Sequence, residues 1–318
     1  MVAGIDVGGS GTKACLVADG RIVAAVILPT DLSIQHNVGD VVLSALDKTL
    51  AEAGSDLGRL TAIGVGIPGE VGQGWVRHAA NLGIGSNGFD LGGHVSSATQ
   101  VPAIVENDMR VAAYGAHHLS IAEGRSLRDL VYVGIGTGVS AGVVLDGSIH
   151  RGSRGLAGEF GHVDMGTGIR CACGSVGCLE TVIGAGGLRD AWDGSPIASL
   201  FQSAEAGDDR AIDAAERAID HLARAMWWLA ASYDPDLFYI GGGVGTSTPY
   251  VRDRVAARWD ALAGESDLAR RVLDPDRIRM YDLEEPVGAY GAALLAAAHR
   301  DRPGKRDETA TWEEESIP

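Results

Sequence analysis

Short apolar runs separated by glycine-containing turns dominate the first part of the chain. Two such runs meet at Asp19-Gly20, a dipeptide typical of tight hairpin turns. After them, Val42, Leu43, Leu46 and Leu50 recur at the spacing of one helix face. The pattern predicts a sheet that opens with a meander and continues through a helix into buried strands. The strands are expected at 2–9, 14–28, 60–67 and 101–105, and the helix at 37–53.

The second half of the chain starts in the same way as the first. Residues 130–144 are expected to form a strand, a glycine turn and another strand, closed by a turn at Asp146-Gly147. A long helix is expected at 208–232, a strand at 237–240 and a last helix at about 286–298. Two halves that open alike suggest an internal duplication of an α/β unit.

Length and charge limit the classes of function. A chain of 318 residues fits two domains, which we place at 1–115 with the helix at about 286–300, and at 116–285, with an acidic, flexible tail at 301–318. The formal charge of -16 argues against nucleic acid or a membrane as partner, although a few local groups still suffice to bind ATP. Neither a signal peptide nor a membrane span is expected, and we predict a soluble cytoplasmic protein that forms a homodimer or a higher homo-oligomer.

Three glycine turns could hold a nucleotide. In the first, residues 6–13 read DVGGSGTK, where backbone amides, hydroxyls and one lysine could clamp phosphates, although a plain hairpin is the alternative and the Walker spacing is absent. A turn at 134–138 could act in the same way; a strand follows it, which excludes a dinucleotide fingerprint. A turn at 241–243 could accept adenine or be an ordinary strand-to-helix connection. The nucleotide-binding candidates are Asp6, Gly8, Gly9, Thr12, Lys13, Gly136, Thr137, Gly138, Gly242 and Gly243.

One histidine and three closely spaced cysteines predict a metal site. His162, Cys171, Cys173 and Cys178 supply the four ligands of a tetrahedral structural zinc site, which leaves no open position for catalysis. Cys15 stands apart and is interpreted as a buried apolar residue. The carboxylates of Glu159 and Glu180 flank the cluster, where they could bind vicinal hydroxyls or simply be solvated.

These segments together resemble the ROK family of bacterial sugar kinases and repressors. The resemblance covers about residues 2–298 and rests on GEFGH at 158–162 and CACGSVGCLE at 171–180, with the first two glycine turns and END at 106–108 in family order. It implies the α/β fold of actin, hexokinase and the Hsp70 ATPase, which is ribonuclease H-like and two-lobed, with ATP and sugar in a central cleft. It also implies that Asp108 is the catalytic base and that the sugar is bound by Asn81, Asn107, Glu159, His162 and Glu180.

The sequence departs from the family pattern at two points. Ile84 follows the Asn-Leu-Gly segment where many family kinases have a tryptophan, and Met109-Arg110 follows END where small residues are common. These departures leave the identity of the sugar open. Glucose, phosphorylated at its C6 hydroxyl, is the first candidate; N-acetylglucosamine, N-acetylmannosamine and fructose are the alternatives.

The expected activity is transfer of the γ-phosphoryl group of ATP to a hexose hydroxyl, with Mg²⁺ arriving on ATP. Inorganic polyphosphate is an alternative donor. A sugar-responsive repressor is a rival function, but the first motif begins at Asp6 and leaves no room for a preceding DNA-binding helix-turn-helix. A sugar sensor without catalysis is a second rival, against which the retained Lys13 and Asp108 argue.

Overall fold

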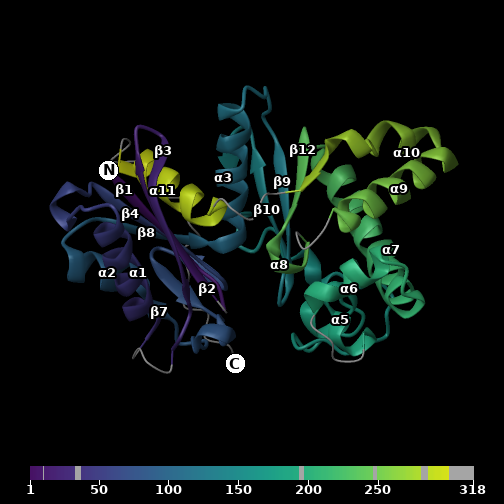
Figure 1. Ribbon diagram of the computed structural model, residues 1–318, viewed down its shortest axis with the longest axis horizontal. Coiled ribbons are helices and arrows are strands. Elements are labelled where there is room, and N and C mark those ends of the chain that lie inside the picture. The colour runs from purple at the N-terminus through teal and green to yellow at the C-terminus, as the bar shows by residue number, and fades with distance from the viewer. Residues whose placement is uncertain (10, 33–36, 193–196, 246–248, 281–285, 301–318) are drawn as a thin grey trace. The chain divides into compact units, whose positions relative to one another are not determined.

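The computed structural model of the protein divides into two compact units (Figure 1). It describes residues 1–9, 11–32, 37–192, 197–245, 249–280 and 286–300. The first unit contains Met1–Glu123, Ser148–Ala157 and the described residues after 285; the second contains Gly124–Gly147 and Gly158–Glu284. The expected boundary at 115 lies inside the helix α3 (Asp108–Ala122), which is continuous and keeps its last turns in the first unit. The tail expected at 301–318 lies outside the described residues.

A five-stranded sheet is the framework of the first unit, in the order β3-β2-β1-β4-β8. β1 runs antiparallel to β2 and parallel to β4, and β8 is parallel to β4. The predicted hairpin turn is confirmed, because Asp19 and Gly20 both have positive φ, of 50° and 74°. The strands of this sheet are β1 (Val2–Val7), β2 (Gly11–Ala18), β3 (Arg21–Pro29), β4 (Ala62–Ile67) and β8 (Ala103–Asn107). A small separate sheet contains β5 (Glu70–Gly72), β6 (Trp75–Arg77) and β7 (Phe89–Asp90). The short strand β11 (Ser148–Ile149) belongs to neither of these two sheets.

Helices cover both faces of this sheet, and strand alternation decides which residues each face receives. Ala3, Ile5 and Val7 of β1 join the core under α1 and α2, whereas Val2 of the same strand joins the core under α11. Asp6 has the parity of Val2 and therefore projects on the α11 side. The helices are α1 (Val38–Glu52), α2 (Leu91–Thr99), α3 and α11 (Val287–Arg300), with short 3-10 turns at Leu57–Arg59 and Ala80–Leu82.

Glycines allow α11 to lie directly on the backbone of its neighbours. A Cβ on Gly4 would collide with the carbonyl oxygen of Ala289, and a Cβ on Gly64 would collide with that of Ala292. On the α3 side, a Cβ on Gly291 would collide with the carbonyl oxygen of Val111. No side chain fits at these crossings, so α11 is held in one position against β1, β4 and α3.

The second unit repeats the central arrangement of the first sheet. Its strands run in the order β10-β9-β12-β13, with β9 antiparallel to β10 and parallel to β12, as β1 is to β2 and β4. The predicted internal duplication is therefore present at the level of topology. The elements are β9 (Leu130–Ile135), β10 (Val139–Leu145), β12 (Leu237–Gly241), β13 (Ile278–Met280), α4 (Glu180–Ile183), α5 (Ala185–Ala191), α6 (Ile197–Glu205), α7 (Asp209–Tyr233), α8 (Gly242–Gly245), α9 (Tyr250–Glu265), α10 (Asp267–Val272) and 3-10 turns at Phe160–His162 and Pro275–Arg277.

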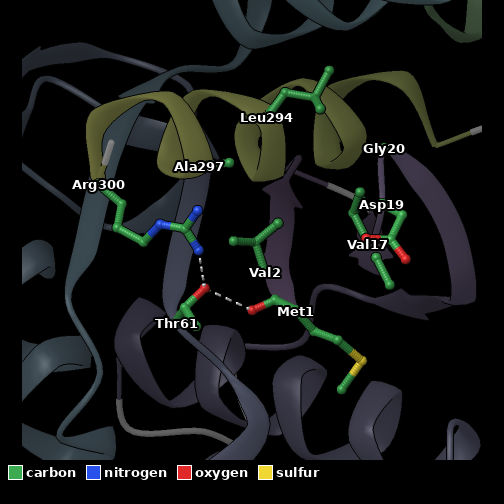
Figure 2. Close-up of a pocket in the computed structure, with 10 residues that line it drawn as sticks. Met1, Val2, Val17, Asp19, Gly20, Thr61, Leu294, Ala297 and Arg300 are labelled. Atoms are coloured by element: carbon green, nitrogen blue, oxygen red, sulfur yellow. Dashed lines mark hydrogen bonds between the residues drawn. The ribbon is translucent and has the colours of Figure 1, made fainter. Parts of the chain in front are cut away.

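A hollow of ≈ 450 Å³ opens in the first unit beside the start of β1 and the end of α11. Figure 2 shows its lining, where Arg300 donates a hydrogen bond of 3.0 Å to the hydroxyl of Thr61. None of the predicted site residues lines it. In the part of the chain that the structure describes, none of the helices could span a membrane.

Replacing Gly64 by alanine should destabilise the first unit, because the new methyl group meets backbone that cannot rotate away. We expect a loss of about 1–3 kcal/mol in the free energy of unfolding, measured by urea titration. Gly186→Ala is the control, since Gly186 lies in α5 with no atom near the position of a Cβ. Equal stability of the two variants would show that α11 does not depend on this contact.

Candidate active site

The carboxylate of Asp6 lies at the end of β1, where α11 begins. A Cβ on Gly288, the second residue of α11, would overlap its Oδ2 atom, and a Cβ on Gly66 of β4 would lie 3.5 Å from its Oδ1 atom. The same Cβ on Gly66 would lie 3.7 Å from the Cα of Asp108. Two glycines thus leave room for an acidic group between β4 and the starts of α3 and α11.

Asp6 is half-buried, and its carboxyl group holds a proton more firmly than an exposed aspartate does. Desolvation by burial, followed by the nearby charge of Asp108, raises its pKa to about 7, while the Lys13 ammonium opposes the shift. Lys13 pairs with Asp6 across β1 and β2 and therefore lies on the same face of the sheet. The two carboxylates repel each other, as they do where a site is built to receive a cation.

The start of α3 places Asp108 beside this carboxylate. Asn107 is the N-cap, and its Oδ1 accepts hydrogen bonds from the amides of Met109 (3.1 Å) and Arg110 (3.3 Å). Its Nδ2 donates to the carbonyl of Gly69 at 3.3 Å. Asp108 is the first residue of α3, where the helix dipole stabilises a negatively charged side chain, and its Oδ1 accepts a hydrogen bond from the Met109 amide at 2.8 Å.

The first glycine turn is tight and lies near Asn81. The amide of Gly8 donates to the carbonyl of Gly11 at 2.9 Å, and a Cβ on Gly9 would lie 3.6 Å from the Cβ of Asn81. Candidates for nucleotide and sugar binding are thus neighbours here. Ser10, which was expected to add a hydroxyl, lies outside the described residues.

Thr12 differs from the other nucleotide-binding candidates among residues 6–13. Its side chain is fully buried, and its hydroxyl forms a hydrogen bond of 2.8 Å with that of Thr30. Because successive strand residues point to opposite faces, Thr12 lies across the sheet from Lys13. The Thr12 hydroxyl is therefore engaged in the protein interior.

A buried ion network behind Asp108 was not anticipated from the sequence. Glu106 accepts hydrogen bonds from Arg110 Nη1 at 2.8 Å and from Arg151 Nε at 2.6 Å. Arg110 also donates to the carbonyl of Gly155. Glu106 lies in β8 and Arg110 in α3, so their spacing of four residues is not the pairing pattern of a single helix. Arg151 is 45 residues from Glu106, and nothing in the sequence pairs them.

The four predicted metal ligands of the second unit come together. One ligand atom from each of His162, Cys171, Cys173 and Cys178 lies within 4.8 Å of all the others. Cys171 Sγ is 3.7 Å from His162 Nδ1, and Cys173 Sγ is 3.6 Å from Cys178 Sγ. A tetrahedral zinc ion with Zn–S bonds of about 2.3 Å requires ligand separations of about 3.8 Å. The donor set and its spacing therefore fit zinc.

Both flanking glutamates contact this cluster. His162 presents Nδ1 to the thiols, which leaves Nε2 facing a Glu159 carboxylate oxygen at 4.0 Å. Glu180 Oε1 lies 3.9 Å from Cys171 Sγ, while its Oε2 accepts a hydrogen bond of 3.1 Å from the amide of Val139. Glu180 thus connects the cysteine cluster to the second glycine turn.

The remaining nucleotide candidates occupy two turns of the second unit. The amide of Gly136 donates to the carbonyl of Gly138 at 2.9 Å, so Gly136, Thr137 and Gly138 form a tight turn between β9 and β10. Gly136 has open space where a Cβ would be, as does Gly243. Gly242 has a φ of 82°, and a Cβ there would collide with the backbone of Ile135.

The predicted residues therefore form two groups, one in each unit. The first unit brings together Asp6 and Asp108 with the first glycine turn, Lys13, Asn81 and Asn107 nearby. The second brings together the metal ligands, Glu159, Glu180 and the turn at 136–138, while Gly242 and Gly243 follow β12.

Known proteins resemble this chain over nearly its whole length. A glucokinase of Halalkalibacterium halodurans is 32% identical over 96% of this chain and 98% of its own. An N-acetylmannosamine kinase of Citrobacter koseri is 31% identical over 92% and 97%. The crystal structure of a ROK hexokinase from Thermus thermophilus superposes with a TM-score of 0.75 at 31% identity, covering 94% of this chain and 99% of that one.

These findings confirm the predicted fold and the predicted resemblance. The architecture is the α/β fold of the actin, hexokinase and Hsp70 ATPase class. The model of the ROK family matches residues 2–299. The chain therefore belongs to the ROK family.

Proposed function

We propose that this protein is a sugar kinase that transfers the γ-phosphoryl group of ATP to a hydroxyl of a hexose, with Asp108 as general base. The observation that carries the proposal is the pair of carboxylates of Asp6 and Asp108 at the starts of α11 and α3. Relatives that are named as sugar kinases and match nearly the whole chain support it.

Asp108 has the chemistry and the position for a base. Phosphoryl transfer requires that the acceptor hydroxyl lose its proton as it attacks the γ-phosphorus. Asp108 is the first residue of α3, where the helix dipole stabilises negative charge, whereas burial and the nearby Asp108 raise the pKa of Asp6 to about 7. Asp108 is thus the member of the pair that accepts the proton.

Asp6 is the carboxylate of this chain that would hold Mg²⁺. Burial and a nearby like charge raise the pKa of Asp6 to about 7, and a divalent cation bound there would offset both effects. When bound, Mg²⁺ neutralises charge on the phosphoryl oxygens. The residues present fit that role, with Lys13 on the same face as a second cation for phosphate.

The glycine turns are suited to hold the donor phosphates. Gly9 is exposed, and Gly136 has open space at the position of a side chain, so a ligand could approach the backbone amides closely. Gly8 and Gly138 shape these turns, and Gly242 and Gly243 would accept adenine. Thr12 contributes by packing, because its hydroxyl is bonded to Thr30.

Each unit carries polar groups that we propose for binding sugar hydroxyls. Asn107 has one amide proton beyond its bond to Gly69, and Asn81 lies beside the first glycine turn. In the second unit, Glu159, His162 Nε2 and Glu180 are the candidates. Glucose is the first acceptor to test; N-acetylmannosamine is the second, because a kinase for that sugar is nearly as similar to this chain as the glucokinase is.

We propose that zinc would have a structural and not a catalytic role. The four ligands complete a tetrahedron, so no position remains for water or substrate. Bound there, the ion would fix the cysteine-containing segment 171–178, which lies just before Glu180 in the sequence. It would also orient His162 so that Nε2 faces away from the metal.

Asp108→Asn should abolish most of the activity. We expect ADP release in the presence of glucose or another hexose from the native protein, and a fall of at least ~10²-fold in kcat in the variant, because the amide cannot accept the proton. A coupled ADP assay over glucose, N-acetylmannosamine, N-acetylglucosamine and fructose measures both. Asp209→Asn is the control, since Asp209 is the first residue of α7 and tests the loss of a charge at a helix start alone. Hexose-independent ADP release, or full turnover by Asp108→Asn, would contradict the proposal.

Gly136→Val should fold normally and weaken nucleotide binding, because the new side chain enters the open space beside the backbone amides. We expect KM for ATP to rise about tenfold or more while KM for the sugar changes less. Gly264→Val in α9 is the control, as Gly264 also has open space around it. Unchanged ATP kinetics would place the nucleotide away from this turn.

Cys173→Ser should lower the zinc content and the affinity for sugar. Glu180 loses its fixed support in the variant, whereas the turn at 136–138 keeps its own hydrogen bonds, so nucleotide affinity should fall less. Elemental analysis and calorimetric titration with each ligand measure these effects. Cys15→Ala is the control, because Cys15 is buried in the first unit and burial raises the pKa of its thiol to about 12. Active native protein without zinc would exclude the assignment.

A further inference from the structure

We propose that Glu106, Arg110 and Arg151 form a positioning network that fixes the direction of the Asp108 carboxylate without touching substrate. This inference rests on the proposed kinase function. Glu106 Oε1 lies 2.8 Å from Arg110 Nη1, and Glu106 Oε2 lies 2.6 Å from Arg151 Nε. None of the three residues is among those expected to bind sugar, nucleotide or metal.

The charged side chains of this network are largely buried, where they lose the free energy of hydration. The side chains of Arg110 and Glu106 are only 3% and 4% exposed, and Arg151 is 25% exposed. A buried ion pair of this kind adds little net stability compared with apolar residues of the same size, because both charges lose their hydration. Two arginines on one buried carboxylate therefore indicate a requirement for defined geometry.

The geometry in question is the junction between β8 and α3. Glu106 Oε1 accepts from the amide of Asn107 at 2.8 Å as well as from Arg110. Asn107 Oδ1 in turn caps the amides of Met109 and Arg110. Asp108 lies in the chain between the two residues that this network joins, so the backbone on both sides of it is held.

The network also fixes a second segment at this junction. Arg151 binds Glu106 and Arg110 donates to the carbonyl of Gly155, so residues 151–155 are held at both ends. Gly155 is buried with a φ of 71°, a conformation in which glycine is favoured. The segment belongs to the first unit although the chain on both sides of it belongs to the second. Its anchoring therefore depends on the same two arginines that hold the start of α3.

Positioning and mere stabilisation predict different kinetics. A misplacement of about 1 Å in a catalytic group can reduce turnover up to ~10²-fold while leaving binding intact. A stabilising role would change the unfolding transition and the amount of active protein, and its effect would not depend on whether Asp108 is present.

The test is Arg110→Met, alone and combined with Asp108→Asn, with Arg110→Lys as the conservative variant. We expect Arg110→Met to lower kcat about 10- to 100-fold with KM for ATP within about twofold, and Arg110→Lys to recover most of kcat because it still donates to Glu106. In the Asp108→Asn background, Arg110→Met should change the residual turnover by less than about twofold. Arg258→Met is the control; it removes an arginine that binds two carboxylates, Glu216 and Asp220, in the other unit.

Arg151→Met provides a second, milder variant in case Arg110→Met does not fold. It leaves the pair of Glu106 and Arg110 in place, so we expect a smaller fall in kcat in the same direction. Turnover within about twofold of native in a folded Arg110→Met or, if that variant is unfolded, in Arg151→Met would overturn the inference. Losses that multiply with Asp108→Asn would overturn it as well. Full turnover by Asp108→Asn alone would instead refute the proposed base, whatever the arginine variants do.

Discussion

The contact of α11 with bare backbone is the constraint on which the first unit depends. Gly4 and Gly64 lie under the carbonyl groups of Ala289 and Ala292, and Gly291 lies against α3, so the helix is fixed by atoms that cannot change rotamer. Once α11 is fixed, its first turn must lie over the end of β1. Asp6, one alternation step beyond Gly4 on the same face, then meets Gly288, and the start of α3 is brought to the same place.

An acidic protein can bind a polyanion if the local field differs from the net charge. The chain carries a formal charge of -16, yet Lys13, the amides of the first glycine turn and the start of α3 are local sources of positive potential near two carboxylates. Burial and repulsion raise the pKa of Asp6 to about 7. The contribution of Asp6 to the free energy of unfolding is therefore lost as the pH rises through that value. A cation bound at Asp6 would offset this loss.

The sequence allowed some of these features to be predicted, and the reasons differ between residues. Hairpins at Asp19 and Asp146 and the long helix α7 follow from local preferences, and the metal cluster follows from ligand spacing. The strand expected at 101–105 in fact runs from Ala103 to Asn107, because Asn107 is both its last residue and the cap of α3. Alternation along β2 could have shown that Thr12 and Lys13 face opposite ways. The contact of Arg151 with Glu106 depends on the path of the chain between them, which no local pattern contains.

The two oxygens of Glu180 have a thermodynamic consequence. One oxygen lies beside Cys171 in the cysteine cluster, and the other accepts a hydrogen bond from the amide of Val139 at the glycine turn. The free energy of ligand binding at the cluster therefore depends on the conformation of the turn. Such coupling is reciprocal by necessity. If a metal ion bound to the cysteine cluster stabilises this arrangement of the turn, a ligand that orders the turn must raise the affinity of the cluster for the ion by the same factor.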